Sequence, residues 1–176
     1  MAEQPWKFHK FGGSSLFDAE CFRRVAAIIE AQGAARLGVV VSAMGGMTDR
    51  LLRLATKAER DDRSFQNELD ELGERYSVAV TSLLKADKRA ALLDQWSQDA
   101  RDLREVLVSV AAVKSAPQRT RDQVAGYGEL WSARLLAAYL AEALPNGRGG
   151  RWLDARQVLT VRQGELGPAV NWPASQ

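Results

Sequence analysis

The chain has 176 residues, of which 46% are hydrophobic and 26% charged, which fits one globular domain and excludes a disordered chain. Its 24 basic and 22 acidic side chains leave a net charge of +2, so charge indicates neither a nucleic-acid nor a membrane partner. One cysteine and one histidine exclude an internal disulfide and the usual Cys/His zinc site, and without a long apolar run we expect a cytoplasmic protein.

The first third of the chain alternates strand, glycine loop and helix. Residues 6–11 form a short aromatic run that predicts a strand, and two glycines end it. Asp18 is a good N-cap for a helix that ends near Gly33. The β-branched run at 37–41 predicts a strand buried on both faces, and Thr48 is expected to cap the next helix. This order predicts a βαβα unit with parallel strands and a right-handed crossover.

The rest of the chain is mainly helical by its apolar spacing. Two long amphipathic helices are predicted at about 65–83 and 93–110, joined as an antiparallel hairpin; a coiled-coil partner is the weaker alternative. After Pro117 we expect a helix over 121–143, a turn over 145–150 and a short strand over 151–153. Residues 164–176 predict no regular element. Three strands are few against the ~5–6 of an average sheet.

A glycine loop after the first predicted strand forms the first candidate site. Lys10 precedes Gly12 and Gly13, and Ser14 follows them. Glycines let a backbone approach an anion closely, a following helix N-terminus offers free N–H groups, and lysine adds a mobile positive charge. The spacing differs from that of a Walker A loop. These residues alone fit an anion site and an ordinary strand–helix turn equally well.

Two further motifs place polar side chains near predicted strand and helix ends. Ser42 follows the second strand, at the carboxyl end where open α/β sheets bind ligands, and Thr48 follows its glycine loop. The alternative gives Ser42 a turn role and Thr48 a capping role. Gly128 interrupts a helical pattern at a cost of ~1 kcal/mol, which usually has a packing or access reason. Glu129 beside it faces either a ligand ammonium or solvent.

Together, the order and spacing of the motifs resemble aspartate kinases, of the amino-acid kinase superfamily. The segments that carry the resemblance are Lys-Phe-Gly-Gly-Ser-Ser at 10–15, Val-Val-Ser-Ala-Met-Gly-Gly-Met-Thr-Asp at 40–49, Gly-Glu-Leu-Trp-Ser-Ala-Arg-Leu at 128–135 and Trp-Leu-Asp-Ala-Arg at 152–156. The sequences of these segments are most similar to the kinase half of bifunctional aspartate kinase–homoserine dehydrogenases. The resemblance implies an α/β fold, the N-terminal portion of that superfamily's αβα sandwich, with a mainly parallel sheet and the helical hairpin as an insertion.

On the phosphate side, the resemblance implies roles for four residues. Lys10 would be the catalytic residue that contacts the transferring phosphate of ATP, and Gly12, Gly13 and Ser14 would line the phosphate path. The aspartate β-carboxylate is already an anion at pH 7, so the reaction needs no general base. Phosphoryl transfer is mainly positioning and charge stabilisation, and Mg²⁺ with ATP would offset the repulsion between the reacting anions. No residue of the chain is predicted to bind a metal directly.

On the amino-acid side, Ser42 and Thr48 would hold the L-aspartate side chain through their hydroxyls, and Glu129 would bind the α-ammonium. Tyr127 stands where many family members have histidine, so no role carries over to it. These roles imply transfer of the ATP γ-phosphate to the β-carboxylate of L-aspartate, giving 4-phospho-L-aspartate, the first step of the lysine, threonine and methionine pathway. The resemblance also implies a homo-oligomer.

Members of this family continue well past position 176 with a glycine-rich nucleotide loop. The resemblance therefore implies that residues 1–176 form a partial kinase domain, the aspartate-binding lobe, without the nucleotide lobe or any regulatory or dehydrogenase domain. We expect no activity and no tight binding of ATP or Mg²⁺ from the chain alone. The Gly-Arg-Gly-Gly run at 147–150 is interpreted as a turn rather than as that loop.

Three other functions fit parts of the pattern. Another amino-acid kinase, acting on glutamate or on a nucleotide, shares the glycine loop but not the wording of the Gly-Glu helix. A non-catalytic interaction module would combine a truncated kinase scaffold with the helical hairpin. Nucleic-acid binding ranks last, because arginines alternate with acidic residues at 60–63 and 99–105, as they do on solvated helix faces.

Overall fold

Two short parallel strands begin the molecule, whose computed structural model describes residues 5–33, 36–144, 150–164 and 167–175. β1 (Lys7–Phe11) and β2 (Leu37–Val41) pair with Lys7 opposite Leu37 and Phe11 opposite Val41. The N–H of Ser42 donates to the Phe11 carbonyl oxygen at 3.0 Å, so the pairing continues past β2. Both predicted strands are confirmed, and the first begins one residue later than expected, at Lys7.

The helix between these strands, α1 (Ala19–Ala31), begins at the predicted aspartate cap. The Asp18 carboxylate accepts the N–H of Cys21 at 2.9 Å, and this bond lowers the pKa of Asp18. A short 3-10 turn, η1 (Gly13–Leu16), separates α1 from the first glycine loop. α1 therefore follows the first glycine loop only after η1, and Asp18 occupies one of the N–H groups of its first turn.

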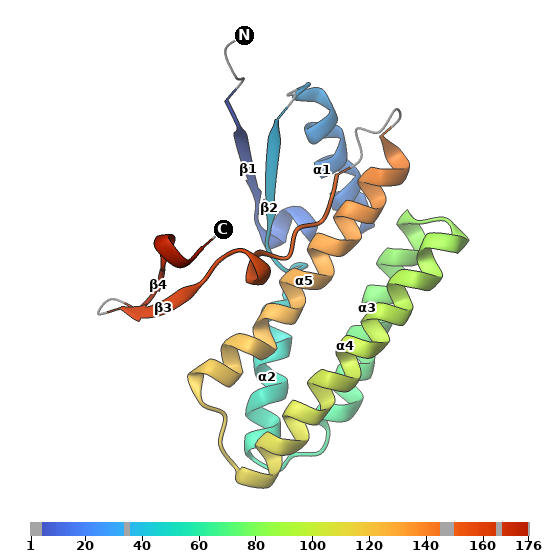
Figure 1. Cartoon of the computed structure of the whole chain (residues 1–176). Helices are drawn as coiled ribbons and strands as arrows, with labels where there is room; N and C mark the ends of the chain where they lie inside the picture. Colours follow the sequence, from blue (N-terminus) through green and yellow to red (C-terminus); the bar gives the residue numbers. More distant parts are fainter. Residues whose placement is uncertain (1–4, 34–35, 145–149, 165–166, 176) are drawn as a thin grey trace.

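Four helices form the body of the molecule (Figure 1). α2 (Met47–Glu59) is central and packs against the other three, and its Leu51 and Leu54 are fully buried. α3 (Phe65–Leu83) and α4 (Ala86–Val113) form the predicted hairpin, and α5 (Gln118–Ala143) then returns along α2 toward the sheet. Among the described residues, no helix is long and apolar enough to cross a membrane.

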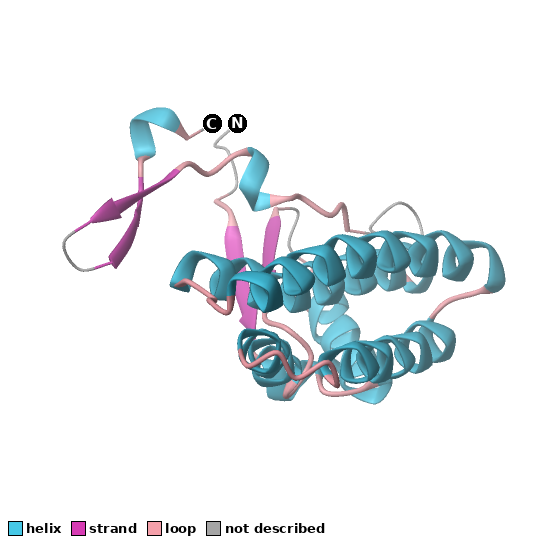
Figure 2. Cartoon of the chain, turned by 90° about the horizontal axis from the view of Figure 1, so that it is seen from below, coloured by secondary structure: helices cyan, strands magenta, loops and turns pink. Residues whose placement is uncertain are grey.

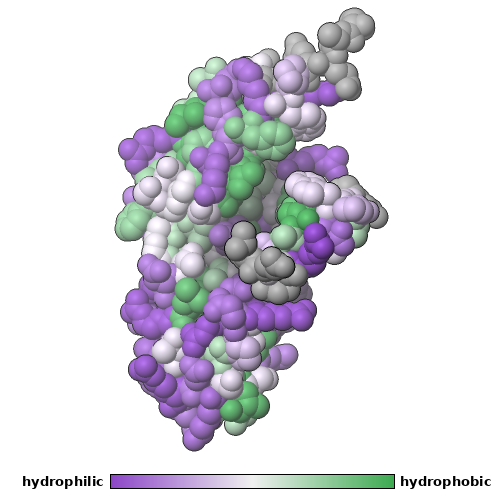
Figure 3. Space-filling model, turned by 90° about the vertical axis from the view of Figure 1, so that its left-hand side faces the viewer, coloured by the Kyte–Doolittle hydropathy of each residue, from purple (hydrophilic) through white to green (hydrophobic). Residues whose placement is uncertain are grey.

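The β1–β2 sheet has one covered face and one open face. Val39 and Val41 are partly buried and pack against the core, whereas Val40 between them is 51% exposed. Phe8 shares the open face with Val40 and is 72% exposed. The expectation that residues 37–41 are buried on both faces is therefore wrong. Hydrophobic patches lie between polar stretches on the side of the molecule that carries β1 (Figure 3).

Residues 150–164 and 167–175, here named the C-terminal arm, run back across the body and then project from it (Figures 1 and 2). The predicted strand at 151–153 is wrong: Trp152 lies over a side chain of α5 instead of joining the sheet. η2 (Ala155–Gln157) follows, and β3 (Val161–Gly164) and β4 (Gly167–Val170) form a separate antiparallel pair before η3 (Trp172–Ala174). The turn predicted at 145–150 lies outside the described residues except for Gly150.

Candidate functional site

The carboxyl ends of β1 and β2 lead into two glycine loops that touch each other. A Cβ on Gly13 would lie 3.1 Å from the carbonyl oxygen of Ala43, and one on Gly45 would lie 3.1 Å from the carbonyl oxygen of Gly13. A Cβ on Gly45 would also lie 2.5 Å from the Phe17 ring, closer than real side chains approach. Within the first loop, the N–H of Ser15 donates to the carbonyl oxygen of Gly12 at 2.9 Å. The glycines therefore let the first two motifs meet backbone against backbone.

α2 begins at the second glycine loop. Its N-cap is Gly46, whose φ of +73° lies in the left-handed region that favours glycine, and the N–H of Met47 donates to the Met44 carbonyl oxygen at 2.8 Å. Thr48 lies inside the first turn, so its predicted capping role is wrong, because the left-handed glycine starts the helix earlier. Thr48 is half-buried at the positive end of the helix dipole.

α5 brings the third motif against the second glycine loop. Gly128 is buried, and a Cβ on it would lie 2.9 Å from the Ala43 Cβ and 3.3 Å from the Met47 Cγ. This close approach explains a glycine in the middle of a helix. Glu129 follows directly and is exposed. The structure thus brings the three predicted motifs together at the carboxyl end of the β1–β2 sheet.

The side chains predicted to act on ligands are accessible at this junction. Lys10 is exposed at the end of β1, and Ser14 is exposed in η1. Ser42 and Thr48 are half-buried on either side of the second glycine loop. Within the described ranges, no hydrogen bond or ion pair engages the side chains of Lys10, Ser42 or Glu129. These groups are therefore available to a ligand.

Two arginines near the loops have protein partners, unlike Lys10. Arg75 of α3 donates to the Phe17 carbonyl oxygen at 3.0 Å, and its guanidinium lies 5.0 Å from the centroid of the Phe17 ring. Burial and the nearby charge of Arg50 lower the pKa of Arg75. Arg50 itself forms an ion pair with Glu71 at 2.7 Å. The helical hairpin therefore supports the segment after the first glycine loop.

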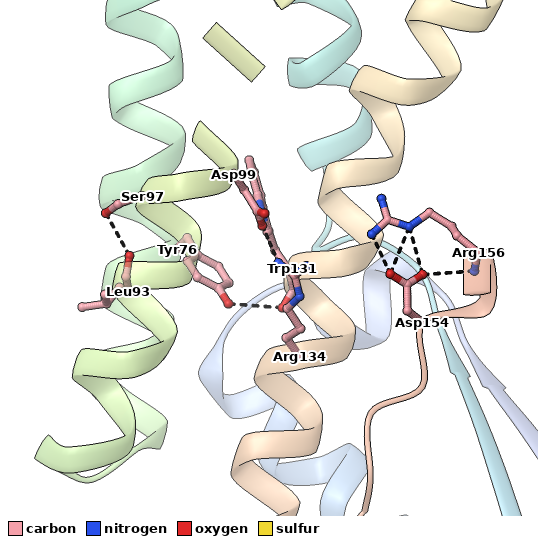
Figure 4. A network of polar contacts seen from close by, with 8 residues as sticks. All are labelled: Tyr76, Leu93, Ser97, Asp99, Trp131, Arg134, Asp154 and Arg156. Carbon is pink, nitrogen blue, oxygen red and sulfur yellow. Dashed lines mark hydrogen bonds and ion pairs between the residues drawn. The ribbon is translucent and has the colours of Figure 1, made fainter. Parts of the chain in front are cut away.

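A polar cluster within the third motif holds α5 against the helical hairpin (Figure 4). The indole N–H of Trp131, which is 1% exposed, donates to the Asp99 carboxylate of α4 at 2.9 Å. The Trp131 carbonyl oxygen accepts the hydroxyl of Tyr76 from α3 at 3.3 Å, and burial raises the pKa of Tyr76, so this hydroxyl stays a donor. Arg134 pairs with the same oxygen of Asp99. The sequence pattern marked Tyr76 only as an apolar position and missed this cluster.

The cluster continues into the C-terminal arm. The Arg134 guanidinium lies 4.8 Å from the centroid of the Trp152 ring. The buried Asp154 accepts the Arg156 Nη2 at 2.6 Å and Nε at 2.9 Å, and this pairing lowers the pKa of Asp154, with a smaller contribution from Arg134. The one signal in the sequence is the spacing of Trp131 and Arg134, which places both on one helix face.

The described residues form an open site without a metal cage of their own. They include no group of three or more His, Cys, Asp or Glu side chains that could hold a metal ion. Mg²⁺ is commonly bound by one or two carboxylates and by substrate phosphates, so an ion carried by a nucleotide does not require such a group. Two surface hollows of about 550 and 700 Å³ lie between α3 and α4 and between α4 and the start of α5, and the predicted site residues line neither.

The fold and the site define an α/β domain of the amino-acid-kinase type. A model of the Amino acid kinase family matches residues 5–170, and the chain belongs to this family. The bifunctional aspartokinase/homoserine dehydrogenase of Daucus carota is 36% identical over 156 residues, which cover 89% of this chain and 17% of that protein. Bifunctional aspartokinase/homoserine dehydrogenase 2 of Escherichia coli K12 is 32% identical over 174 residues, which cover 97% of this chain and 20% of that protein.

A solved structure gives the same result. The crystal structure of E. coli aspartokinase III in complex with aspartate and ADP, in the R-state, matches with a TM-score of 0.77 and 25% identity, over 95% of this chain and 35% of that one. The chain is thus an aspartate-kinase-like amino-acid kinase domain. It spans about a fifth or less of the length of the two bifunctional relatives.

Proposed function

We propose that the chain forms the aspartate-binding part of an aspartate kinase, which transfers the γ-phosphate of ATP to the β-carboxylate of L-aspartate. The observation that carries the proposal is the meeting of three motifs at one sheet edge, where Gly13 and Gly128 both contact the loop at Ala43. The aspartate and ADP bound to E. coli aspartokinase III support it.

On the amino-acid side, charge and position support roles for three residues. Glu129 is an exposed carboxylate beside the glycine loops and binds the α-ammonium of L-aspartate. Ser42 and Thr48 donate hydroxyl hydrogens to the substrate carboxylate, and the positive end of the α2 dipole beside Thr48 favours an anion. The ligand therefore lies between α5 and the start of α2.

On the phosphate side, Lys10 is the catalytic residue. Its exposed ammonium has no described protein partner and lies beside the loop of Gly12, Gly13 and Ser14. A cation there reduces the repulsion between the substrate carboxylate and the γ-phosphate, and its effect grows as charge develops in the transition state. Mg²⁺ enters with ATP and supplies further charge compensation on the phosphates.

A titration with two ligands tests the amino-acid side. We expect Glu129→Gln to weaken L-aspartate binding, because the variant keeps the shape but loses the charge that faces the ammonium. The loss is about 1.5–3 kcal/mol if the bound substrate largely shields this exposed carboxylate from water. Succinate lacks the α-ammonium and carries only negative charge, so its affinity should not fall. Amide shifts in ¹H–¹⁵N spectra of the labelled chain measure both affinities. The matched control is Glu74→Gln, which removes an exposed carboxylate from α3. Equal losses for both ligands would leave Glu129 with a packing role.

A second titration tests the phosphate side. Lys10→Met should weaken binding of tripolyphosphate, whereas Lys7→Met, on the other face of the same strand, should not. With ATP, Mg²⁺ and L-aspartate, we expect only background turnover from the chain alone, because none of the assigned residues binds adenine and alignment provides ~7–11 kcal/mol of such barriers. Turnover that Lys10→Met abolishes would contradict this expectation, and a tripolyphosphate affinity unchanged in that variant would refute the role of Lys10.

The exposed sheet face favours a second candidate function, the binding of a further polypeptide or of a second copy. Trp6 and Phe8 are 59% and 72% exposed, and parallel sheets are usually covered on both faces. Light scattering of the wild type and of Phe8→Ser measures self-association. A mass that is monomeric in both would remove the second copy from consideration.

A further inference from the structure

We infer that Asp99 is a positioning residue for the candidate site: it fixes the rotation of α5 about its own axis and thereby the place of Glu129. The inference rests on the proposed function in one respect, the binding of an ammonium by Glu129. Asp99 itself lies on α4, in the helical hairpin, and acts on the site through α5.

The first observation is that one carboxylate oxygen of Asp99 holds two groups on the same face of α5. The indole N–H of Trp131 donates to Oδ2 at 2.9 Å, and the guanidinium of Arg134 pairs with the same atom. Both side chains are almost fully buried, and Tyr76 binds the backbone carbonyl oxygen of Trp131 from α3 (Figure 4). The hairpin therefore binds α5 at Trp131, within one turn of Glu129.

The second observation is that α5 is also held about one turn before Trp131, which limits its rotation. Gly128 leaves no room for a Cβ against Ala43, so the helix backbone and the second glycine loop are in direct contact. Side-chain atoms of a helix lie about 6 Å from its axis, so a rotation of about 10° moves the Glu129 carboxylate by about 1 Å. A misplacement of that size can cost about 100-fold in a reaction that depends on alignment.

Charge gives the direction of the change when Asp99 is removed. Arg134 would keep its buried guanidinium but lose the carboxylate that pairs with it, which is unfavourable. Another acidic group whose charge interacts with Arg134 is Asp154 in the C-terminal arm. We therefore expect Arg134 to shift toward the arm and to turn α5, which displaces Glu129 and presses Gly128 against the loop at Ala43.

The test begins with the chain without ligand, as Asp99→Leu, Asp99→Asn and the control Asp94→Leu, which alters an exposed residue of the same helix. Asp99→Leu should move the backbone amide signals of Glu129 and of residues 43–45 in ¹H–¹⁵N spectra. Asp99→Asn keeps an acceptor for the Trp131 indole and should move them less, and Asp94→Leu should leave them in place. Unmoved signals in the folded Asp99→Leu chain would overturn the inference.

The second arm measures L-aspartate and succinate. We expect Asp99→Leu to weaken L-aspartate about tenfold and succinate less than twofold, and to have no further effect in a Glu129→Gln background, because Asp99 acts through Glu129. Additive losses in the double variant would overturn the inference. If the wild type binds no L-aspartate while the amide signals still move, the proposed function fails and the positioning stands. If Asp99→Leu does not fold, Asp99→Asn and Trp131→Phe make the same comparison.

Discussion

The two sides of α5 are held in different ways. Toward the helical hairpin, Trp131 is 1% exposed and both its indole N–H and its backbone carbonyl oxygen have partners on α3 and α4. Toward the C-terminal arm, Trp152 lies over Arg134 and Gly150 lies near Leu140, and farther along the arm Trp172 is 74% exposed. The difference indicates that the helical hairpin supports the candidate site through α5, whereas the C-terminal arm contacts α5 only near its start at 150–156.

The largest expected effect comes from a substitution on the hairpin side of α5. Trp131→Ala should lower the free energy of unfolding by about 3–5 kcal/mol, because it leaves a cavity and removes the indole N–H that binds Asp99. Trp172→Ala in the arm should change it by no more than about 0.5 kcal/mol. Urea unfolding followed by far-UV circular dichroism measures both values. Similar losses in the two variants would show that the arm is as firmly packed as the hairpin.

The next largest effect compares two glycines of α5 that lie two residues apart. Replacing them by alanine should change the stability of the chain in opposite directions. Gly128→Ala should destabilise the chain by about 1–3 kcal/mol, since its Cβ would crowd Ala43. Gly126→Ala meets no atom within 4 Å and should stabilise it by about 0.5–1 kcal/mol through helix propensity. Thermal melts of the two variants decide the matter. Stabilisation by both substitutions would mean that α5 does not touch the glycine loop.

The smallest effect concerns the arm and pH. Because the pKa of Asp154 is lowered in the folded chain, its pairing with Arg156 stabilises the arm above the ordinary carboxyl value of 3.8. This stabilisation is lost as pH falls from there through the lowered pKa. The amide signals of residues 155–157 should therefore change in that range while the helices stay folded. In Asp154→Asn this transition should disappear, and its persistence would assign it to another group.

Much of this arrangement was predictable from local pattern. The hairpin follows from apolar residues at steps of three and four, and the two strands follow from short runs ended by glycine. The three motifs indicated a common site because the carboxyl ends of parallel strands lie at one sheet edge. The helix start at Gly46 was not predictable from the capping preference of Thr48, because a left-handed glycine overrides it.

The remaining features depend on contacts between distant segments. Asp99 and Arg134 lie on different helices, and each alone resembles a residue of a solvated face. β3 and β4 form a hairpin in a region whose proline and glycine content gives no alternating pattern. The open face of the sheet was also not predictable, because Val40 continues an apolar run that is typical of a buried strand.

The caps of α1 and α2 give the site an electrical polarity. The carboxylate of Asp18 binds the first turn of α1, whereas Gly46 at the start of α2 has no side chain to offer. On the α1 side, an anion that approaches the two glycine loops meets an N–H group already bound by a carboxylate. On the α2 side it meets a helix end that no side chain caps, although the exposed Asp49 in the first turn reduces the positive potential there. A zwitterion is thereby favoured in the orientation that places its negative end toward the start of α2. This preference comes from the backbone and exists before any side chain contacts the ligand.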